Sequence, residues 1–311
     1  MSIVQSTSPP AVALVQERLR DLVGEWFGSD SRLVAHAPQP VRRSWSLQFP
    51  LEVEVGGQRR RLVAKIPVWE AAPTLEAALA AGPQPSTRRE FDVLVALARA
   101  VGNAGDGDFA AVEPIAYVPE LNAIVTEMLD ARPLRELLGI PADRRVAALL
   151  ARTGRLLRLS HEEVGGLERT RFPDLGSRLE GLRSEVDRLP DPPRPLTLGL
   201  EIVGRRAVSL AGSEVNGAVL HNDLNLANVL VTPRGRVALL DPNPGSGIAV
   251  DDLAKRAAAV RTLPRRLLSG GLVPRRSLVT SWTRALLAGY RPADREATVV
   301  FRALAVLQRW V

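Results

Sequence analysis

A segment near residue 220 combines the residue types that transfer of a phosphoryl group to a hydroxyl would use. The segment reads HNDLNLAN over residues 221–228, and two short apolar runs follow it and end at Asp241. A carboxylate such as Asp223 can accept the proton of an attacking hydroxyl. The amide oxygen of Asn228 and the carboxylate of Asp241 are the oxygen ligands that Mg²⁺ prefers, and Mg²⁺ neutralises nucleotide phosphates. The sequence therefore predicts Asp223 as the base and Asn228 with Asp241 as metal ligands.

The two predicted metal ligands lie at the ends of a predicted hairpin. Residues 228–241 read NVLVTPRGRVALLD, which is two apolar strands around a Pro-Arg-Gly turn. Because a hairpin folds back on itself, it brings Asn228 and Asp241 to the same side of a cleft.

The first part of the chain has the pattern of a helix and several strands. Residues 11–27 carry apolar residues at helical spacing. LEVEV at residues 51–55 alternates, and RRRLVAKIPV at residues 59–68 returns after Gly56-Gly57, which is a turn typical of a β-hairpin. Two more strands are predicted within residues 112–129.

The second part of the chain is predicted to be mainly helical. Residues 144–163, 178–189 and most of 250–311 have helical periodicity, and the proline-rich residues 189–195 end the second of these helices. The change from strands to helices falls near residues 128–132.

Together these features resemble the kinase-like phosphotransferases of the aminoglycoside phosphotransferase and choline kinase superfamily. Lys65 in LVAKI resembles the strand lysine that contacts the α- and β-phosphates of ATP, and Glu90 resembles the glutamate that pairs with it. Residues 125–134, VTEMLDARPL, resemble the hinge between the two lobes of that family. Asp252 in the sequence DLA resembles the aspartate that braces the catalytic loop.

The resemblance implies an α+β, bilobal protein-kinase-like fold. An N-lobe with an antiparallel sheet and one helix would span residues 1–128, and a mainly helical C-lobe would span residues 129–311. The implied cofactors are ATP and Mg²⁺, with ATP between the lobes and its adenine against the backbone of Glu127 to Leu129. Lys65, paired with Glu90, would orient the phosphates, and the γ-phosphoryl group would pass to a hydroxyl of a small molecule.

Several positions depart from the family pattern. Asn222 and Asn225 stand where the family often has Gly and His, and residues 38–46 replace the glycine-rich phosphate loop without any glycine. Residues 245–247, Gly-Ser-Gly, are interpreted as a turn rather than as a phosphate-binding nest. The base and the metal ligands are unaffected by these departures.

The lysine and its glutamate each have a second interpretation. Lys65 lies among apolar residues, and a buried lysine needs a partner, which favours the phosphate role over a solvated one. Glu90 has the spacing from Thr87 that a capping box requires, so it could serve only the start of a helix. Glu76 is a rival partner for Lys65.

Composition excludes several other kinds of protein. The chain has no cysteine and only three histidines among 311 residues, so thiolate metal sites are excluded and a three-histidine zinc site is nearly so. With aromatic residues at 4% and no zinc-finger spacing, nucleic-acid binding is not expected. No apolar run approaches the roughly 20 residues of a membrane helix, and no export signal is evident, so a cytoplasmic location is expected.

Three other functions remain open at this point. An aminoglycoside or other antibiotic kinase would use the same motifs, and a nucleotide-binding pseudokinase scaffold would keep the fold without activity. A protein kinase is disfavoured because Asp252 lies only eleven positions after Asp241, which is too short a span for a segment that docks a protein substrate. The oligomeric state and the choice between ATP and GTP are not readable from the sequence.

The charge of the C-terminal segment bears on the acceptor. Residues 251–311 contain twelve basic and four acidic residues, a net charge of +8. Because a polycationic aminoglycoside needs carboxylates around it, this segment favours a neutral or anionic, sugar-like acceptor, unless its arginines face solvent or an acidic membrane surface.

Overall fold

The computed structural model describes residues 9–137, 143–267 and 276–310, and the chain divides into two compact units. The first unit comprises Met1–Arg99 and Val112–Asp130, and the second comprises Ala100–Ala111 and Ala131–Val311. The sequence placed the boundary two residues earlier and assigned residues 100–111 to the first lobe. These residues instead belong with the second unit because Ala110 N donates to Val237 O at 2.9 Å and Val237 N donates to Asp108 O at 3.0 Å.

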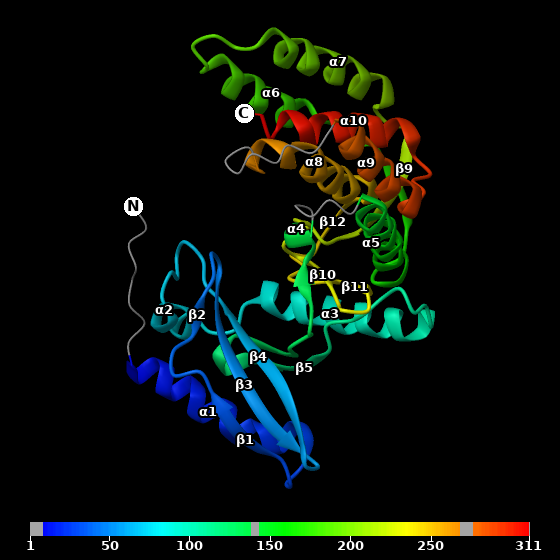
Figure 1. The fold of residues 1–311 in the computed structure, drawn as a ribbon. Coiled ribbons are helices and arrows are strands. Elements are labelled where there is room, and N and C mark those ends of the chain that lie inside the picture. Colours follow the sequence, from blue (N-terminus) through cyan, green and yellow to red (C-terminus); the bar gives the residue numbers. More distant parts are fainter. Residues whose placement is uncertain (1–8, 138–142, 268–275, 311) are drawn as a thin grey trace. The chain divides into compact units, whose positions relative to one another are not determined.

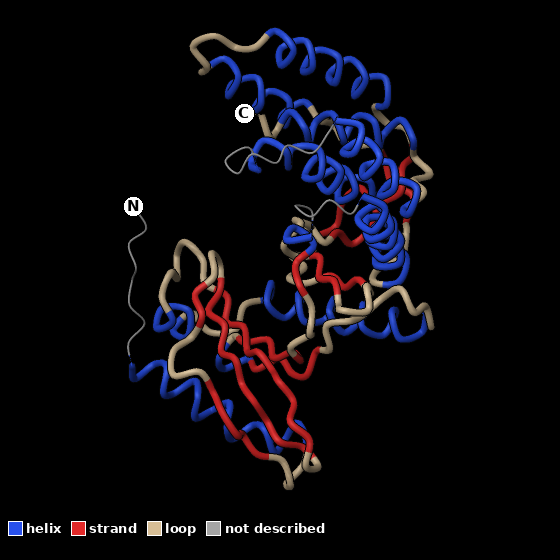
Figure 2. The backbone as a smooth tube through the Cα atoms, in the orientation of Figure 1, coloured by secondary structure: helices blue, strands red, loops and turns tan. Residues whose placement is uncertain are grey.

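The first unit is built on a six-stranded antiparallel sheet (Figures 1 and 2). The strands pair in the order β1-β3-β4-β6-β5, and β2 adds to β3. Helix α1 covers the sheet with apolar residues that include the fully buried Val15 and Leu19. The elements are α1 (Pro9–Phe27), β1 (Arg32–His36), β2 (Val41–Arg42), β3 (Ser46–Val55), β4 (Gln58–Pro67), α2 (Leu75–Ala80), α3 (Pro85–Ala104), β5 (Pro114–Val118), a 3₁₀ turn (Pro119–Leu121) and β6 (Ala123–Glu127).

The predicted hairpin at residues 51–68 is confirmed. Val55 pairs with Gln58, so Gly56 and Gly57 form the whole loop, and their φ angles are 56° and 78°. A two-residue hairpin loop of this kind needs positive φ at both positions, which glycine adopts without steric cost. The register of this hairpin sets which residues of β4 face the core, and it leaves Lys65 beside Ile124 of β6.

The capping box predicted for Thr87 and Glu90 is wrong. Helix α3 begins at Pro85, so Thr87 already lies inside its first turn. Proline suits the first helical position because it has no N–H to satisfy there. The chain before the helix is held by a hydrogen bond from Gln84 N to Asn122 Oδ1 at 2.9 Å. Glu90 therefore does not cap helix α3.

The second unit is mainly helical, as expected, with two small antiparallel sheets in the orders β11-β10-β7 and β12-β9-β8. Figure 2 shows its strands as short segments among many helices. Its elements are β7 (Arg132–Pro133), α4 (Leu134–Leu137), α5 (Asp143–Glu163), β8 (Glu168–Arg171), α6 (Gly176–Asp187), α7 (Arg194–Leu210), β9 (Glu214–Leu220), β10 (Val229–Val231), β11 (Val237–Leu239), β12 (Gly245–Ile248), α8 (Ala249–Leu267), α9 (Arg276–Tyr290) and α10 (Arg295–Leu307).

Two of these strands were not predicted. Residues 245–247, interpreted as a turn, lie in β12, and the polar residues 168–171 form β8. Both strands flank β9. The prediction missed them because Gly-Ser-Gly and Glu-Arg-Thr-Arg lack the alternating apolar pattern by which strands are recognised.

Helices α5 and α9 cross in close contact because glycines face each other's backbone. A Cβ on Gly289 would lie 2.0 Å from Ala151 O, and a Cβ on Gly154 would lie 2.2 Å from Leu286 O. The close crossing brings His161 at the end of α5 to Tyr290 at the end of α9, with 2.8 Å between His161 Nδ1 and the Tyr290 hydroxyl.

The α+β class is confirmed, with antiparallel pairing in each sheet. Among the described residues, the structure contains no helix that is both long enough and apolar enough to span a membrane.

Candidate active site

The loop at residues 221–228 follows β9 and has an irregular backbone that internal hydrogen bonds define. Asp223 N donates to His221 O at 2.7 Å, and Asn225 N donates to Asp223 O at 2.8 Å. Asn222 has a φ of 57°, which asparagine tolerates better than most residues. This conformation accounts for the glycine that the family often has at this position.

Asp223 and Asn228, the predicted base and metal ligand, lie in direct contact. Asn228 Nδ2 donates to both the backbone oxygen and Oδ2 of Asp223, each at 2.9 Å. Asn225 Nδ2 donates to Asp223 Oδ1 at 3.0 Å, and the Asn225 Oδ1 in turn accepts from the N–H groups of Ala227 and Asn228. The Asp223 side chain is therefore fixed by two amides while the residue remains exposed to solvent.

The hairpin folds back so that the backbone at Asp241 lies next to that at Asn228. Val229 pairs with Leu239, and Leu240 N donates to Asn228 O at 2.9 Å, so Asp241 follows the residue bonded to Asn228. Asp241 has a φ of 54°. Since Asn228 Nδ2 is used by Asp223, the Asn228 amide oxygen is available as a ligand.

Asn228 and Asp241 fit a magnesium ion by their chemistry, because both offer oxygen ligands and Mg²⁺ completes its shell with water and phosphate. Among the described residues, no group of three or more His, Cys, Asp or Glu side chains is arranged to hold a metal. A site with one amide and one carboxylate falls below that count, so the prediction of these two ligands stays open.

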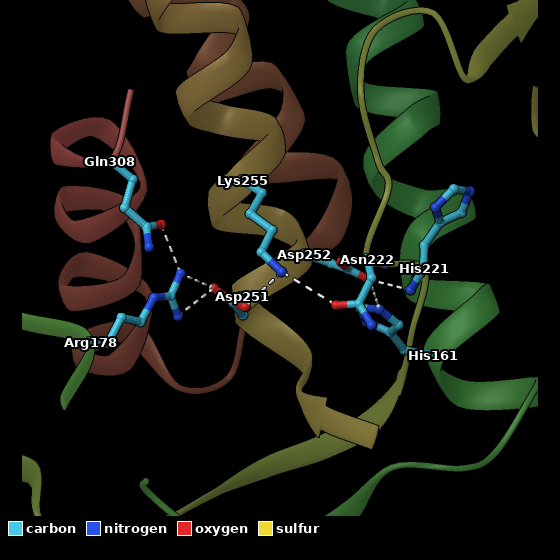
Figure 3. Close-up of polar contacts among 8 residues, drawn as sticks. All are labelled: His161, Arg178, His221, Asn222, Asp251, Asp252, Lys255 and Gln308. Atoms are coloured by element: carbon cyan, nitrogen blue, oxygen red, sulfur yellow. Dashed lines mark hydrogen bonds and ion pairs between the residues drawn. The ribbon is translucent and has the colours of Figure 1, made fainter. Parts of the chain in front are cut away.

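Asp252 braces the loop from the first turn of α8. Its carboxylate accepts the backbone N–H groups of His221 and Asn222, and it lies 3.3 Å from His161 Nε2. Burial pushes the pKa of Asp252 upward, but the hydrogen bond and charge of His161 and the contacts of His221 outweigh it and hold the pKa below its ordinary value. The bracing role that the resemblance assigned to Asp252 is therefore matched by these contacts (Figure 3).

His221 contributes mainly through its backbone rather than through its ring. Its carbonyl oxygen accepts from Asp223 N and from Asn243 N. The buried ring lies near the backbone of Leu240, but neither ring nitrogen forms a hydrogen bond of normal geometry within the described part of the chain. Burial lowers the pKa of the His221 imidazole, so the ring is kept neutral. The hydrogen bonds that His221 contributes to the architecture of the loop are therefore those of its backbone N–H and carbonyl groups.

Arg256 is a part of the site that the sequence did not reveal. It is fully buried on α8, and its Nη2 donates to Asn225 O at 2.5 Å, while Nε and Nη1 have no hydrogen-bond partner among the described residues. Burial lowers the pKa of Arg256 to about 9. Arg256 thus supports Asn225, which holds Asp223. Its only signal in the sequence was a position four residues, or one helical turn, after Asp252.

Lys65 and Glu90 form an ion pair within the first unit. Lys65 Nζ lies 2.6 Å from Glu90 Oε1, and the side chains are 17% and 11% exposed. Strand β4 and helix α3 therefore bring together the two residues that the resemblance paired. Their contact with ATP phosphates stays a prediction.

The predicted adenine-binding segment follows β6. Glu127 N donates to Glu113 O at 2.8 Å and Met128 N donates to Arg61 O at 2.7 Å, so both N–H groups are used inside the sheet. The Glu127 side chain binds Arg60 at 2.7 Å. The next N–H along the chain is that of Leu129, which makes its backbone the donor to test for adenine.

The segment without glycines that replaces the phosphate loop is a tight turn between β2 and β3. Arg43 N donates to Ser46 O at 2.8 Å, so Ser44 and Trp45 lie at the tip, and Trp45 is 69% exposed. This turn offers few backbone N–H groups to a phosphate.

An open cavity of about 720 Å³ lies within the second unit. It is lined by parts of β8, β9 and β12 and by residues of α6, α8 and α10, and Asn222 lies in its wall next to Asp223. The lining comes from residues 165–178, 217–222 and 246–251 and from Phe301.

No family model matches the chain, and no curated protein matches it in sequence. Several solved structures are similar in fold. An amicoumacin kinase, solved with AMP-PNP and Ca²⁺, is 12% identical with a TM-score of 0.55, and the match covers 95% of this chain and 83% of that one. A choline/ethanolamine kinase family protein from Mesorhizobium loti is 18% identical with a TM-score of 0.51, covering 94% and 83%. A glucosamine kinase is 18% identical with a TM-score of 0.50, covering 88% and 72%.

The chain therefore has the fold of these solved kinases, which confirms the predicted kinase-like fold. At these identities, the likeness concerns the fold alone. Evidence for activity must therefore come from the residues of the loop and of the cavity.

Proposed function

We propose that the chain transfers the γ-phosphoryl group of ATP to a hydroxyl group of a small molecule. The observation that carries the proposal is the arrangement of Asp223, held by the amides of Asn225 and Asn228 and exposed to solvent. A fixed, accessible carboxylate next to an amide suited to a metal is what this reaction needs. The fold, shared with solved small-molecule kinases, supports the proposal.

In the proposed reaction, Asp223 orients the acceptor hydroxyl and accepts its proton as the hydroxyl oxygen bonds to the γ-phosphorus. The bond from that phosphorus to the β–γ bridging oxygen breaks, and ADP leaves. Asn228 and Asp241 would hold Mg²⁺, which supplies positive charge to the phosphate oxygens when it is bound. Lys65, held by Glu90, would contact the α- and β-phosphates, and the backbone of Glu127 to Leu129 would face the adenine.

The acceptor that we propose is neutral or anionic and sugar-like rather than a polycationic antibiotic. Four charged residues line the cavity in the second unit, namely Glu168, Arg171, Arg178 and Asp251. Asp251 is already engaged by Arg178 and Lys255, so few carboxylates remain for a polycation.

The expectation that the arginines of the C-terminal segment surround the acceptor differs from what the structure shows. Among the described basic residues of this segment, none lines the cavity, and Lys255 reaches it only through Asn222 and Asp251. The arginines at 261, 284, 291 and 295 are exposed, and Arg275 lies outside the described residues. These exposed arginines face solvent, and the preference for a neutral or anionic acceptor now depends on the cavity itself.

A screen of hydroxyl compounds with MgATP tests the proposal. We expect formation of ADP together with a phosphorylated product for at least one sugar, polyol or metabolite, and no product when Mg²⁺ is removed. Binding of MgATP without transfer to any compound, aminoglycosides included, would instead support a nucleotide-binding scaffold. Efficient phosphorylation of an aminoglycoside would overturn the proposed acceptor class but not the reaction.

A further inference from the structure

A row of polar and charged side chains includes three residues of the wall of the cavity in the second unit, namely Asn222, Arg178 and Asp251. Figure 3 shows the row, which runs from Gln308 through Arg178, Asp251 and Lys255 to Asn222. The Arg178 guanidinium lies 3.4 Å from Asp251 Oδ1, and Lys255 Nζ lies 2.9 Å from Asp251 Oδ2. The side chains of Arg178, Asp251 and Lys255 are 28%, 11% and 31% exposed.

One carboxylate in this row serves two cations. Lys255 occupies one oxygen of Asp251 at normal ion-pair distance, whereas both contacts of Arg178 with the other oxygen are long. The short hydrogen bond of Arg178, at 2.8 Å, goes to the uncharged Gln308. The row therefore has a surplus of one positive charge, and Arg178 is the less compensated cation.

The remaining charged residues of the lining do not remove this surplus. Arg171 and Glu168 both lie on β8, both are exposed, and their charges cancel. Apart from this pair, the charged residues that line the cavity are Arg178 and Asp251, and Lys255, which does not line the cavity, takes up the second oxygen of Asp251. An anionic group bound there would gain charge-assisted hydrogen bonds from Arg178, which suits carboxylate and phosphate geometry.

Asn222 connects the row to the reacting group. Its Oδ1 accepts from Lys255 Nζ at 3.3 Å, so its Nδ2 is left to donate to a ligand. A Cβ built on Gly245 would lie 3.1 Å from that Nδ2, so the amide lies beside β12. Asn222 lines the cavity and directly precedes Asp223 in the chain, so we expect a ligand bound at the row to lie near the base.

We infer that the acceptor is an anionic hydroxyl compound, a hydroxylated carboxylate or phosphate, and that Arg178 and Lys255 select it. This inference rests on the proposed function and narrows its acceptor class. Arg178 contacts the anionic group, Asn222 donates to an adjacent oxygen, and Lys255 orients the Asn222 amide. Amino sugars, which carry the opposite charge, are disfavoured by the same row.

Three pyranoses that differ in charge test the inference. Glucuronate, glucose and glucosamine share a ring and carry negative, zero and positive charge. Calorimetry or ligand-observed NMR without nucleotide should show that glucuronate binds most tightly and glucosamine most weakly. Arg178→Met should weaken glucuronate binding by about tenfold and leave glucose binding unchanged, because only the charged contact is lost. Arg183→Met is the matched control, since Arg183 lies exposed on the same helix and away from the cavity.

The transfer assay separates this inference from the proposed function. Glucuronate binding that depends on Arg178, without any phosphoryl transfer in the screen, would retain the anion site and refute the reaction. Glucuronate that fails to bind, or that binds no better than glucose, overturns the inference. A neutral or cationic compound that proves the best acceptor, unaffected by Arg178→Met, overturns it as well while leaving the reaction intact.

Discussion

The ion pair of Lys65 and Glu90 and the loop at residues 221–228 hold their charged side chains by different means. In the first unit, a regular strand and a regular helix bring Lys65 and Glu90 together. In the second unit, the loop has little regular structure, and buried polar groups of α5 and α8 define it. Secondary structure is enough to position a single ion pair, whereas an exposed base on an irregular loop needs a network of hydrogen bonds behind it.

The largest effect on stability should come from the network behind the loop. Asp252→Ala would leave two backbone N–H groups and His161 without their buried partner, so it should lower the free energy of unfolding by about 3 to 5 kcal/mol. Asp92→Ala removes the exposed ion pair with Arg88 on α3 and should cost only about 0.3 to 0.5 kcal/mol.

Urea unfolding of both variants makes this comparison. Equal losses in the two variants would show that Asp252 does not brace the loop more than a surface carboxylate braces a helix. Asp252→Asn, which keeps one acceptor oxygen, should fall between the wild type and Asp252→Ala.

The lysine of the first unit should matter for turnover more than for folding. Lys65→Met removes the proposed phosphate contact and should lower turnover on the order of 10²-fold, because misplaced phosphates react slowly. Glu90→Gln should lower it less, since the lysine remains. Arg59→Met is the control. Arg59 lies on the same strand as Lys65, and it forms an exposed ion pair with Glu52. A Lys65 variant that unfolds would mean that the lysine is structural, and one that turns over as fast as Arg59→Met would refute the phosphate contact.

For the predicted metal ligand Asp241, substitution by asparagine is a more specific test than substitution by alanine. Asp241 has a φ of 54°, which asparagine tolerates, so Asp241→Asn should keep the backbone and lose only the charge. We expect MgATP affinity to fall by about tenfold, or about 1.4 kcal/mol, and the affinity for ATP without Mg²⁺ to stay unchanged. Calorimetry with and without Mg²⁺ measures both, and an equal change in both would exclude Asp241 as a ligand.

The smallest expected effect concerns pH. Burial lowers the pKa of His221 from its ordinary value of 6.5. At a pH just below 6.5, the His221 ring is therefore protonated in the unfolded chain but stays neutral in the folded chain. Stability should therefore fall as the solution is acidified below pH 6.5. His221→Gln should show a shallower decline of Tm over this range, because its side chain does not titrate. Parallel Tm curves for the two proteins would show that His221 contributes nothing to the pH dependence.

The same contrast explains what the sequence could predict. The hairpin around Gly56-Gly57 and the hairpin between Asn228 and Asp241 were predictable because turn residues and apolar alternation are local signals. The resemblance supplied Lys65 with Glu90, and the structure brings them together. For the catalytic loop, the sequence supplied the residue types but not the contacts that hold them.

What could not be predicted depends on tertiary contacts. Arg256 looked like one more arginine in a chain rich in that residue, and only packing shows that it is buried against Asn225. The contact of Arg178 with Asp251 joins residues 73 positions apart. The charge count of the C-terminal segment misled because it could not separate solvent-facing arginines from those near a cavity.

The reaction itself is tested most directly by Asp223→Asn. Asparagine keeps the shape of the side chain but cannot accept a proton, so transfer to the best acceptor of the screen should fall by about 10²- to 10⁴-fold while MgATP affinity, measured on the same preparation, stays near that of the wild type. Turnover close to wild type in a variant that still binds MgATP would contradict the assignment of Asp223 as the base.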